Sequence, residues 1–223
     1  MKIAEIFYSI QGEGTLAGMP SVFVRTSGCN LRCSWCDTPY TSWEPEGIEM
    51  RIPDILHRVN EFNATHVVVT GGEPLIAKGI SEFIQELRTS RRHITIETAG
   101  TVYVSLDCDL MSISPKLGNS TPEGNWAKQH DKLRIQIDVI RRLMDCCDYQ
   151  LKFVVSTPED LTEIRDIVSR VSAEPERVLL MPEGTNSAEL HRKAVWIAGL
   201  CKEHGFRYGP RLHVDIWGDR RGV

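Results

Sequence analysis

Two hydrophobic patterns alternate along the chain. Short runs rich in β-branched residues predict strands, and longer segments with an apolar residue every three or four positions predict helices. The expected strands cover residues 22–25, 66–70, 93–98, 111–114, 150–156, 178–181 and 212–217. The run at 66–70 is almost continuously apolar, as expected for a parallel strand covered on both faces.

The expected helices lie between these strands, at residues 53–62, 80–87, 133–144, 161–171 and 187–204. Gly205 is suited to end the last of them. No repeat, low-complexity segment or flexible linker divides the sequence, so we expect one domain over residues 1–223. The alternation of strands and helices predicts βαβ units around a parallel sheet, hence an α/β fold.

Unusual polar and glycine-rich clusters come directly after the expected strands. They are Gly28-Cys29, Gly71 to Pro74, Thr98 to Gly100, Ser114 to Lys116 and Pro182 to Gly184. In parallel α/β architectures, ligands bind at the carboxyl ends of the strands. We therefore expect these clusters to converge on one edge of an open, incomplete barrel of six or seven strands.

Composition narrows the possible functions. The 223 residues are 41% hydrophobic and 25% charged, a balance that is typical of a globular protein. The formal net charge of −4 argues against binding to nucleic acid or to a membrane surface, because both favour an excess of basic residues. The longest apolar stretch, residues 194–201, is far shorter than the roughly 20 residues of a membrane-spanning helix. Because no export signal precedes the first strand, we expect a cytoplasmic protein.

Three of the seven cysteines, Cys29, Cys33 and Cys36, fall within eight residues. Clustered thiolates favour zinc, copper(I) or an iron–sulfur cluster. Structural zinc takes four protein ligands, and no fourth Cys or His is near. A [4Fe–4S] cluster also usually has four thiolates, so three would leave one iron open to an external ligand. The remaining cysteines, at 108, 146, 147 and 201, suit ordinary core packing.

The spacing C-x3-C-x2-C, with Trp35 before the last cysteine, resembles the radical S-adenosylmethionine (SAM) superfamily. That resemblance implies a [4Fe–4S] cluster whose open iron binds the amino and carboxylate groups of SAM. The tetrapeptide Gly71 to Pro74 looks like the superfamily motif that holds the SAM amino group, which implicates Gly72 and Glu73. Taken alone, this tetrapeptide is only a turn signal.

Further candidate residues have an ordinary structural alternative each. The side chains of Ser114, Pro115 and Lys116 suit the carboxylate or the ribose of SAM. Those of Met181, Pro182 and Glu183, together with Trp35, suit its adenine. Ordinary packing at the end of a strand is the alternative. Gln11, Gly12 and Glu13 can bind the edge of a heterocycle, or form a plain turn. Arg25 can bind a carboxylate, or form a surface ion pair. Asp37 and Thr38 can meet Mg²⁺, or Asp37 can cap a turn.

Five sequence blocks together resemble the 7-carboxy-7-deazaguanine synthase family of radical SAM enzymes. They occur at residues 10–14, 25–38, 70–74, 96–101 and 113–116, in this order. The resemblance implies an incomplete TIM-like barrel with a radical SAM core, and homodimers that need Mg²⁺. It also implies an external reductant such as flavodoxin, and conversion of 6-carboxy-5,6,7,8-tetrahydropterin to 7-carboxy-7-deazaguanine with loss of ammonia.

Position by position, the resemblance implies a role for each matching residue. The cluster is held by Cys29, Cys33 and Cys36, and SAM is contacted by Gly72 and by Ser114 to Lys116. The pterin is contacted by Ile10 to Gly12, Arg25 and Thr70. Mg²⁺ is bound by Thr38. The tail from Trp217 to Val223 is a candidate lid. No side chain is expected to perform the bond chemistry itself, because the cofactors supply it. The family more often has Gln before the Pro at Met181-Pro182, so the adenine contact is less well defined.

Two alternatives remain at this point. A glycyl-radical activase shares the cysteine spacing, but has no use for Gln11, Gly12 and Glu13 or for Arg25 as readers of a heterocycle. A non-catalytic zinc or electron-transfer module accounts for the three cysteines, but gives no task to Gly72 and Glu73.

Overall fold

One nine-stranded sheet runs through the computed structural model, which describes residues 1–223. The strands are β1 (Lys2–Ile10), β2 (Pro20–Thr26), β3 (Ile48–Glu49), β4 (His66–Gly71), β5 (His93–Thr98), β6 (Leu110–Ile113), β7 (Asp148–Val155), β8 (Val178–Pro182) and β9 (Arg207–Tyr208). Their order is β3-β1-β2-β4-β5-β6-β7-β8-β9. β1 is antiparallel to β2 and β3, and every pairing from β2 to β9 is parallel. The edges β3 and β9 do not pair, so the barrel is open, as expected.

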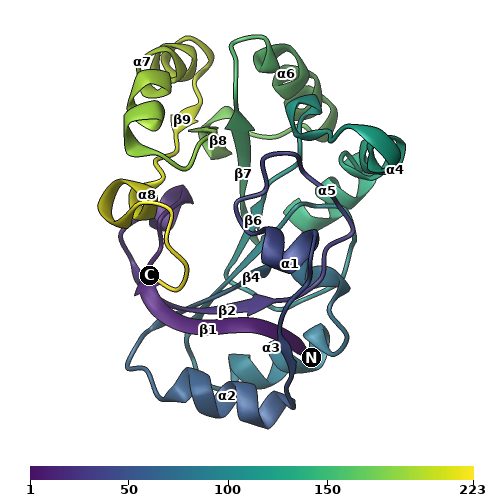
Figure 1. Cartoon of the computed structure of the whole chain (residues 1–223), viewed down its shortest axis with the longest axis vertical. Coiled ribbons are helices and arrows are strands. Elements are labelled where there is room, and N and C mark those ends of the chain that lie inside the picture. Colours follow the sequence, from purple (N-terminus) through teal and green to yellow (C-terminus); the bar gives the residue numbers. More distant parts are fainter.

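The helices are α1 (Pro39–Ser42), α2 (Ile52–Asn60), α3 (Ile80–Arg88), α4 (Ala127–Leu133), α5 (Ile137–Met144), α6 (Asp160–Val171), α7 (Ser187–His204) and α8 (Leu212–Trp217). In Figure 1, α2 and α3 lie at one end of the sheet and α6 and α7 at the other. α8 and the C-terminus lie beside β1 (Figure 1). None of these helices is both long and apolar enough to cross a membrane.

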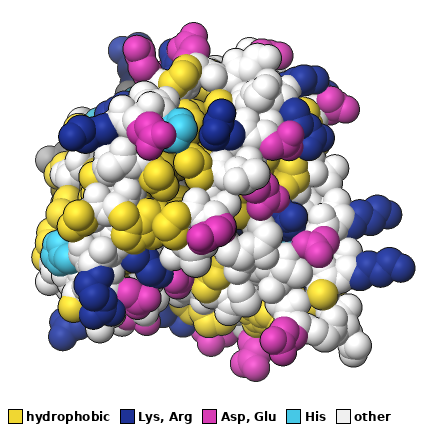
Figure 2. Space-filling model, turned by 90° about the horizontal axis from the view of Figure 1, so that it is seen from above, with side chains coloured by type: hydrophobic (Ala, Val, Ile, Leu, Met, Phe, Trp, Pro, Cys, Tyr) yellow, Lys and Arg dark blue, Asp and Glu magenta, His cyan; other side chains and the backbone are white.

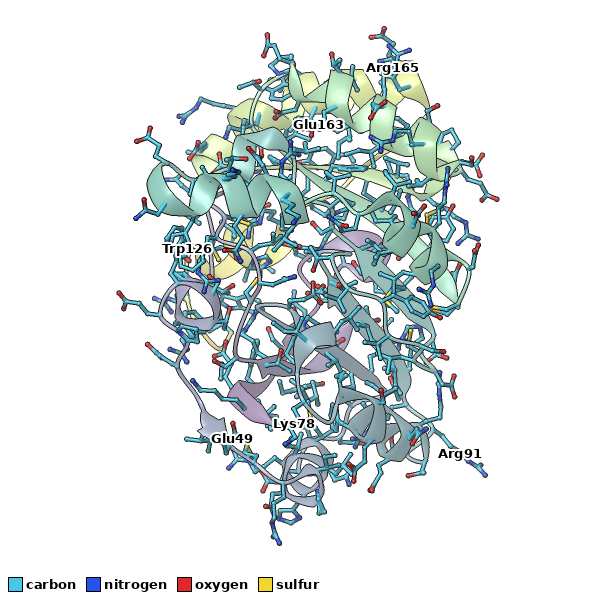
Figure 3. The ribbon with its side chains drawn as sticks, turned by 90° about the vertical axis from the view of Figure 1, so that its right-hand side faces the viewer. Glu49, Lys78, Arg91, Trp126, Glu163 and Arg165 are labelled. Atoms are coloured by element: carbon cyan, nitrogen blue, oxygen red, sulfur yellow. The ribbon has the colours of Figure 1, made fainter.

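Alternate residues of the parallel strands face opposite sides of the sheet. One set packs against the helices in the main hydrophobic core: Val22 and Val24, Val67 and Val69, Ile94 and Ile96, Met111 and Ile113, Leu151 and Phe153. The residues between or just beyond them are largely polar and face the concave side: Arg25, Thr70, Glu97, Ser112 and Lys152. The outer surface carries solvated charges such as Lys78, Arg91 and Arg165 (Figure 3). The sheet thus separates an apolar core from a polar hollow.

The structure confirms the expected strands at 22–25, 66–70, 93–98, 111–114, 150–156 and 178–181 within a residue or two, and the helix at 187–204. Gly205 ends that helix in the left-handed conformation, at φ 71°. The strand β1 was not among the predicted elements, although its last residues were among the candidate substrate contacts. It is half-buried along most of its length and so lacks a clear apolar face.

Two expectations were wrong. Residues 212–217 form the helix α8 instead of a strand. The chain leaves the sheet at Gly209, whose amide donates to the Leu180 carbonyl, and the following Pro210 has no N–H with which to continue a ladder. The helix expected at 133–144 begins only at Ile137, as α5, because α4 ends at Leu133 and Gln136 leaves the helical conformation; the Gln136 side chain donates to the Lys132 carbonyl, 2.8 Å away, at the end of α4.

Candidate active site

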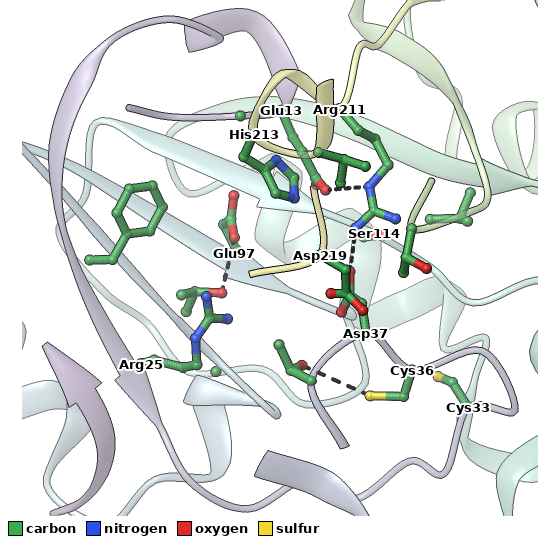
Figure 4. Close-up of a pocket in the computed structure, with 18 of the residues that line it drawn as sticks. Glu13, Arg25, Cys33, Cys36, Asp37, Glu97, Ser114, Arg211, His213 and Asp219 are labelled. Atoms are coloured by element: carbon green, nitrogen blue, oxygen red, sulfur yellow. Dashed lines mark hydrogen bonds and ion pairs between the residues drawn. The ribbon is translucent and has the colours of Figure 1, made fainter. Parts of the chain in front are cut away.

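A cavity of about 490 Å³ opens at the carboxyl ends of the strands. This volume is in the usual range for small-molecule sites. Its walls include most of the side chains singled out from the sequence: Ile10, Gln11, Gly12, Glu13, Arg25, Cys29, Cys33, Trp35, Cys36, Thr38, Thr70, Gly72, Ser114, Lys116, Met181 and Glu183. Loops far apart in the sequence therefore meet at one place, as the topology predicted (Figure 4).

The three cysteines lie on the loop after β2, and all three face this cavity. Hydrogen bonds from the Gly28 amide to the Thr41 carbonyl (2.8 Å) and from the Trp43 indole to the Cys33 carbonyl (3.0 Å) hold the loop. Burial raises the pKa of Cys29 to about 11 and that of Cys33 to about 12, so these thiols lose protons when they bind a metal.

The donor set fits a cluster better than a single ion. No group of three or more His, Cys, Asp or Glu side chains is arranged to hold one metal ion. In a [4Fe–4S] cluster each thiolate binds a different iron, so three sulfurs around a common cavity suffice. Cys29, Cys33 and Cys36 are thus the groups that would hold such a cluster in this fold.

Gly72 brings two backbone segments together beside the cysteines. A Cβ there would lie only 2.3 Å from the Gly28 carbonyl oxygen and 2.7 Å from the Thr41 oxygen. The next residue, Glu73, is fully buried outside the cavity lining, and its carboxylate accepts hydrogen bonds from the Leu75 and Ala99 amides and the Thr98 hydroxyl at 2.8–3.0 Å. Its side chain is therefore engaged by the chain itself, whereas Gly72 lines the cavity.

On the β6 side, Lys116 and Trp35 form a second wall. The Lys116 ammonium donates to the hydroxyl and the carbonyl of Ser114, at 2.9 and 3.0 Å, and lies 5.9 Å from the centre of the Trp35 ring. The Trp35 indole donates to the Asn119 carbonyl at 3.0 Å, which fixes the ring at the cavity wall. Pro115, between the two functional candidates, does not line the cavity.

Opposite the cysteines, two carboxylates and a buried lysine form a charged cluster. The Lys152 ammonium, whose side chain is 5% exposed, lies 2.5 Å from Glu13 and 3.7 Å from Glu97. Glu97 also accepts from Gln11 at 3.1 Å and from the Thr70 hydroxyl at 2.9 Å. Burial lowers the pKa of Lys152, but the two carboxylates outweigh it and raise that pKa, so the lysine is charged at neutral pH.

Arg211 joins Glu13 to the cysteine loop. Its guanidinium donates to Glu13 at 3.2 Å, to the Gly184 carbonyl at 2.5 Å and to Asp37 (Figure 4). Burial on its own would raise the pKa of Glu13, but the positive charges of Lys152 and Arg211 outweigh it and hold that pKa far below the usual value. Glu13 is therefore an ionised acceptor in the wall of the cavity.

Arg25 meets the C-terminal tail at the mouth of the cavity. Its Nε donates to Glu5 at 2.6 Å, while its two terminal nitrogens have no partner within the chain. Glu5 also accepts from Tyr40 at 2.7 Å and from Arg221 at 3.2 Å, and the Arg221 guanidinium lies 3.8 Å from the centre of the Tyr40 ring. Residues 218–223 line the cavity, so this network holds the tail over it.

Thr38 lies at the cavity wall two residues after the last cysteine of the triplet, with its hydroxyl 3.9 Å from the Cys36 sulfur. Its neighbour Asp37 is paired with Arg211, whereas the contact of the Thr38 hydroxyl with the Cys36 sulfur is long and weak. A hydroxyl ligand supplemented by water and substrate oxygens suits Mg²⁺, which keeps several exchangeable ligands.

Some candidates lie differently from what sequence reasoning assumed. Pro182 is buried in β8 outside the cavity, and Glu183 pairs with Lys193 of α7 at 2.7 Å. Sequence reasoning missed Lys152, Arg211 and His213, which line the cavity. A lysine inside the apolar run of β7 was a usable signal, because Lys is rarely buried unless paired.

Comparison with known proteins agrees with this geometry. The sequence model of the radical SAM superfamily matches residues 23–116. The 7-carboxy-7-deazaguanine synthase of Halobacterium salinarum is 47% identical, over 98% of this chain and 91% of that protein, and the synthase of Rhodopirellula baltica is 45% identical, over 99% and 88%. The crystal structure of QueE from Escherichia coli covers 93% of this chain and 92% of its own, with a TM-score of 0.69 at 23% identity, and shares the fold.

Proposed function

The chain belongs to the 7-carboxy-7-deazaguanine synthase family of radical SAM enzymes, and from that premise we propose how its residues divide the work of the family's reaction. The enzyme contracts the ring of 6-carboxy-5,6,7,8-tetrahydropterin to 7-carboxy-7-deazaguanine and releases ammonia. The observation that carries the proposal is that the three cysteines, the Gly72 turn and the charged side chains Glu13, Glu97 and Lys152 all line one cavity.

The cofactors are a [4Fe–4S] cluster, SAM and Mg²⁺. When bound, the cluster and SAM together supply an organic radical that abstracts a hydrogen atom from the substrate. Cys29, Cys33 and Cys36 hold the cluster. The backbone at Gly72 and the polar groups of Ser114 and Lys116 position SAM.

The opposite wall binds and orients the pterin. Carboxylate oxygens accept hydrogen bonds, so Glu13 and Glu97 favour the N–H-rich edge of an aminopyrimidinone ring. Gln11 and Thr70 hold Glu97 in place from two sides. The backbone of Ile10 and Gly12 completes this wall beside them.

The substrate carboxylate lies at the other end of the heterocycle in this assignment. The two terminal nitrogens of Arg25, which are unpaired in the chain, can donate two parallel hydrogen bonds to the substrate carboxylate. The Thr38 hydroxyl would hold Mg²⁺, whose positive charge would stabilise the negative charge of the bound substrate. The tail at 218–223 excludes water and competing reactions.

The decisive experiment is anaerobic reconstitution followed by incubation with SAM, Mg²⁺, a reductant and the pterin. We expect about four irons and four sulfides per chain, and 7-carboxy-7-deazaguanine detected by mass spectrometry. Cys33→Ala should lose the brown absorbance and all SAM cleavage, whereas Cys201→Ala, a buried cysteine away from the cavity, should retain both. Full turnover by an iron-free Cys33→Ala enzyme would refute the proposal.

Assembly and cell location complete the proposed function. Exposed apolar side chains, Val195, Tyr208 and Ile216, lie on α7, β9 and α8, and Figure 2 shows hydrophobic side chains gathered on this end of the molecule. They support a homodimer, and a Val195→Asp variant that sediments like the wild type would argue against this face.

An external one-electron donor of the flavodoxin class reduces the cluster. The seven free cysteines suit the reducing cytoplasm.

A further inference from the structure

One buried arginine connects three loops that are far apart in the sequence. Arg211 lies in the segment just before α8, and its side chain is 6% exposed. It bonds Glu13 in the loop after β1, Asp37 next to the cysteine triplet and the Gly184 carbonyl after β8. Three of its five N–H donors are used, one on each loop.

Arg211 is the side chain whose ion pairs reach both the pterin-side loop, residues 11–19 after β1, and the cysteine loop, residues 27–38 after β2. Glu13 has a second cation in Lys152, at 2.5 Å, but Arg211 is the only cation that pairs with Asp37. The Asp37 side chain is 43% exposed, so it is free to turn into solvent once its partner is lost. Removing the guanidinium would therefore separate the two loops and leave two like charges in the same wall.

The same segment brings the tail to the cavity. The Leu212 amide donates to the Gly12 carbonyl at 2.8 Å, and a Cβ on Gly12 would lie 2.0 Å from the His213 ring, so α8 is packed directly on the pterin-side loop. α8 then leads into residues 218–223 at the mouth. The position of the tail thus depends on the contacts around Arg211.

We propose that Arg211 is a positioning residue that fixes the pterin-side loop, the cysteine loop and the C-terminal segment relative to one another, and so couples SAM cleavage to product formation. This inference rests on the proposed function. Hydrogen abstraction requires the substrate carbon to lie in contact with the reacting group, and a misplacement of about 1 Å costs roughly a hundredfold in rate. If these loops were loosened, SAM could be cleaved without removal of a hydrogen atom from the substrate.

The test compares Arg211→Gln with Arg88→Gln. Arg88 also bridges two carboxylates, Asp107 at 2.9 Å and Asp109 at 2.8 Å, but lies outside the cavity, so it is a matched control. Hydrogen–deuterium exchange is measured on the reconstituted enzyme without substrate. We expect Arg211→Gln to speed exchange together in peptides covering residues 12–14, 37–38 and 212–223, and Arg88→Gln to leave these peptides unchanged.

The second readout is the ratio of 5′-deoxyadenosine to 7-carboxy-7-deazaguanine at equal iron content. We expect Arg211→Gln to raise this ratio about tenfold or more, and Arg211→Lys, which keeps the charge but cannot span three acceptors, to give an intermediate value. An unchanged ratio, or unchanged exchange in the cysteine loop, would overturn the inference. If Arg211→Gln does not fold, Arg211→Lys decides by the same two readouts. A wild type that makes no product refutes the proposed function instead, while the exchange data still judge the contacts of Arg211.

Discussion

Gly72→Ala is the substitution whose effect follows most directly from the packing around a single backbone atom. The new Cβ would lie 2.3 Å from the Gly28 carbonyl oxygen and 2.7 Å from the Thr41 carbonyl oxygen. Both neighbours are backbone atoms, so no side chain can rotate away. The Gly28 oxygen would have to retreat by about 1 Å to reach ordinary contact.

That retreat disturbs the cysteine loop itself. The Gly28 oxygen accepts the Glu73 amide at 2.9 Å, and the Gly28 amide donates to Thr41 at 2.8 Å, so both bonds are strained by the same shift. Overpacking of this kind costs about 1–3 kcal/mol. For a chain of this size, that corresponds to a fall in Tm of about 2–12 °C. Cys29 follows Gly28 directly, so iron incorporation should fall as well.

The assay is iron and sulfide per chain after anaerobic reconstitution, with thermal unfolding of the same samples and no SAM present. Gly199→Ala is the matched control: its Cβ meets no atom within 4 Å on α7, and replacing a helical glycine by alanine stabilises by about 0.5–1 kcal/mol. A Gly72→Ala enzyme with the iron content and Tm of the wild type would refute the reasoning.

Three further substitutions test separate parts of the site. Thr38→Val should leave iron content unchanged but raise the Mg²⁺ concentration for half-maximal product formation, and an unchanged Mg²⁺ response would remove Thr38 from the metal site. Arg221→Gln breaks the bond to Glu5 and should make the tail more sensitive to limited proteolysis, with a higher KM for the pterin; a tail as resistant as in the wild type would contradict the docking contacts. Because Lys152 helps to hold the pKa of Glu13 below its ordinary 4.5, the ionised Glu13 stabilises the fold above that pH and this contribution is lost on acidification. The free energy of unfolding in urea should therefore fall below about pH 4.5 by up to about 1.4 kcal/mol per pH unit more in the wild type than in Glu13→Gln, and parallel pH profiles would exclude it.

Local patterns predicted the strands that carry the site, because each is a short β-branched run followed by a polar or glycine cluster. The cysteine triplet and Gly72 belong to such clusters, and their meeting at one edge followed from parallel topology alone. The prediction failed at the C-terminal segment. Leu212, Val214 and Ile216 alternate like a strand, but the chain leaves the sheet at Gly209, the following Pro210 has no N–H with which to continue a ladder, and the segment forms α8 instead.

The ion pairs of the site were beyond the reach of sequence reasoning. Glu13 and Arg211 are 198 positions apart, and nothing in either neighbourhood indicates the other. Glu73 is a different kind of failure. Its place in the motif suggested a carboxylate that is free to bind a ligand, whereas in the folded chain this carboxylate accepts hydrogen bonds from the Leu75 and Ala99 amides. Pairing of distant polar groups depends on the exact course of loops, which hydrophobic periodicity does not encode.

The alternation along the parallel strands has a consequence for how this pocket can diversify. Within β5, Ile96 contributes to the core and the adjacent Glu97 to the cavity; within β7, Phe153 and Lys152 divide in the same way. Evolution or design can therefore exchange pocket residues for a new substrate while every methyl group that holds sheet and helices together stays in place.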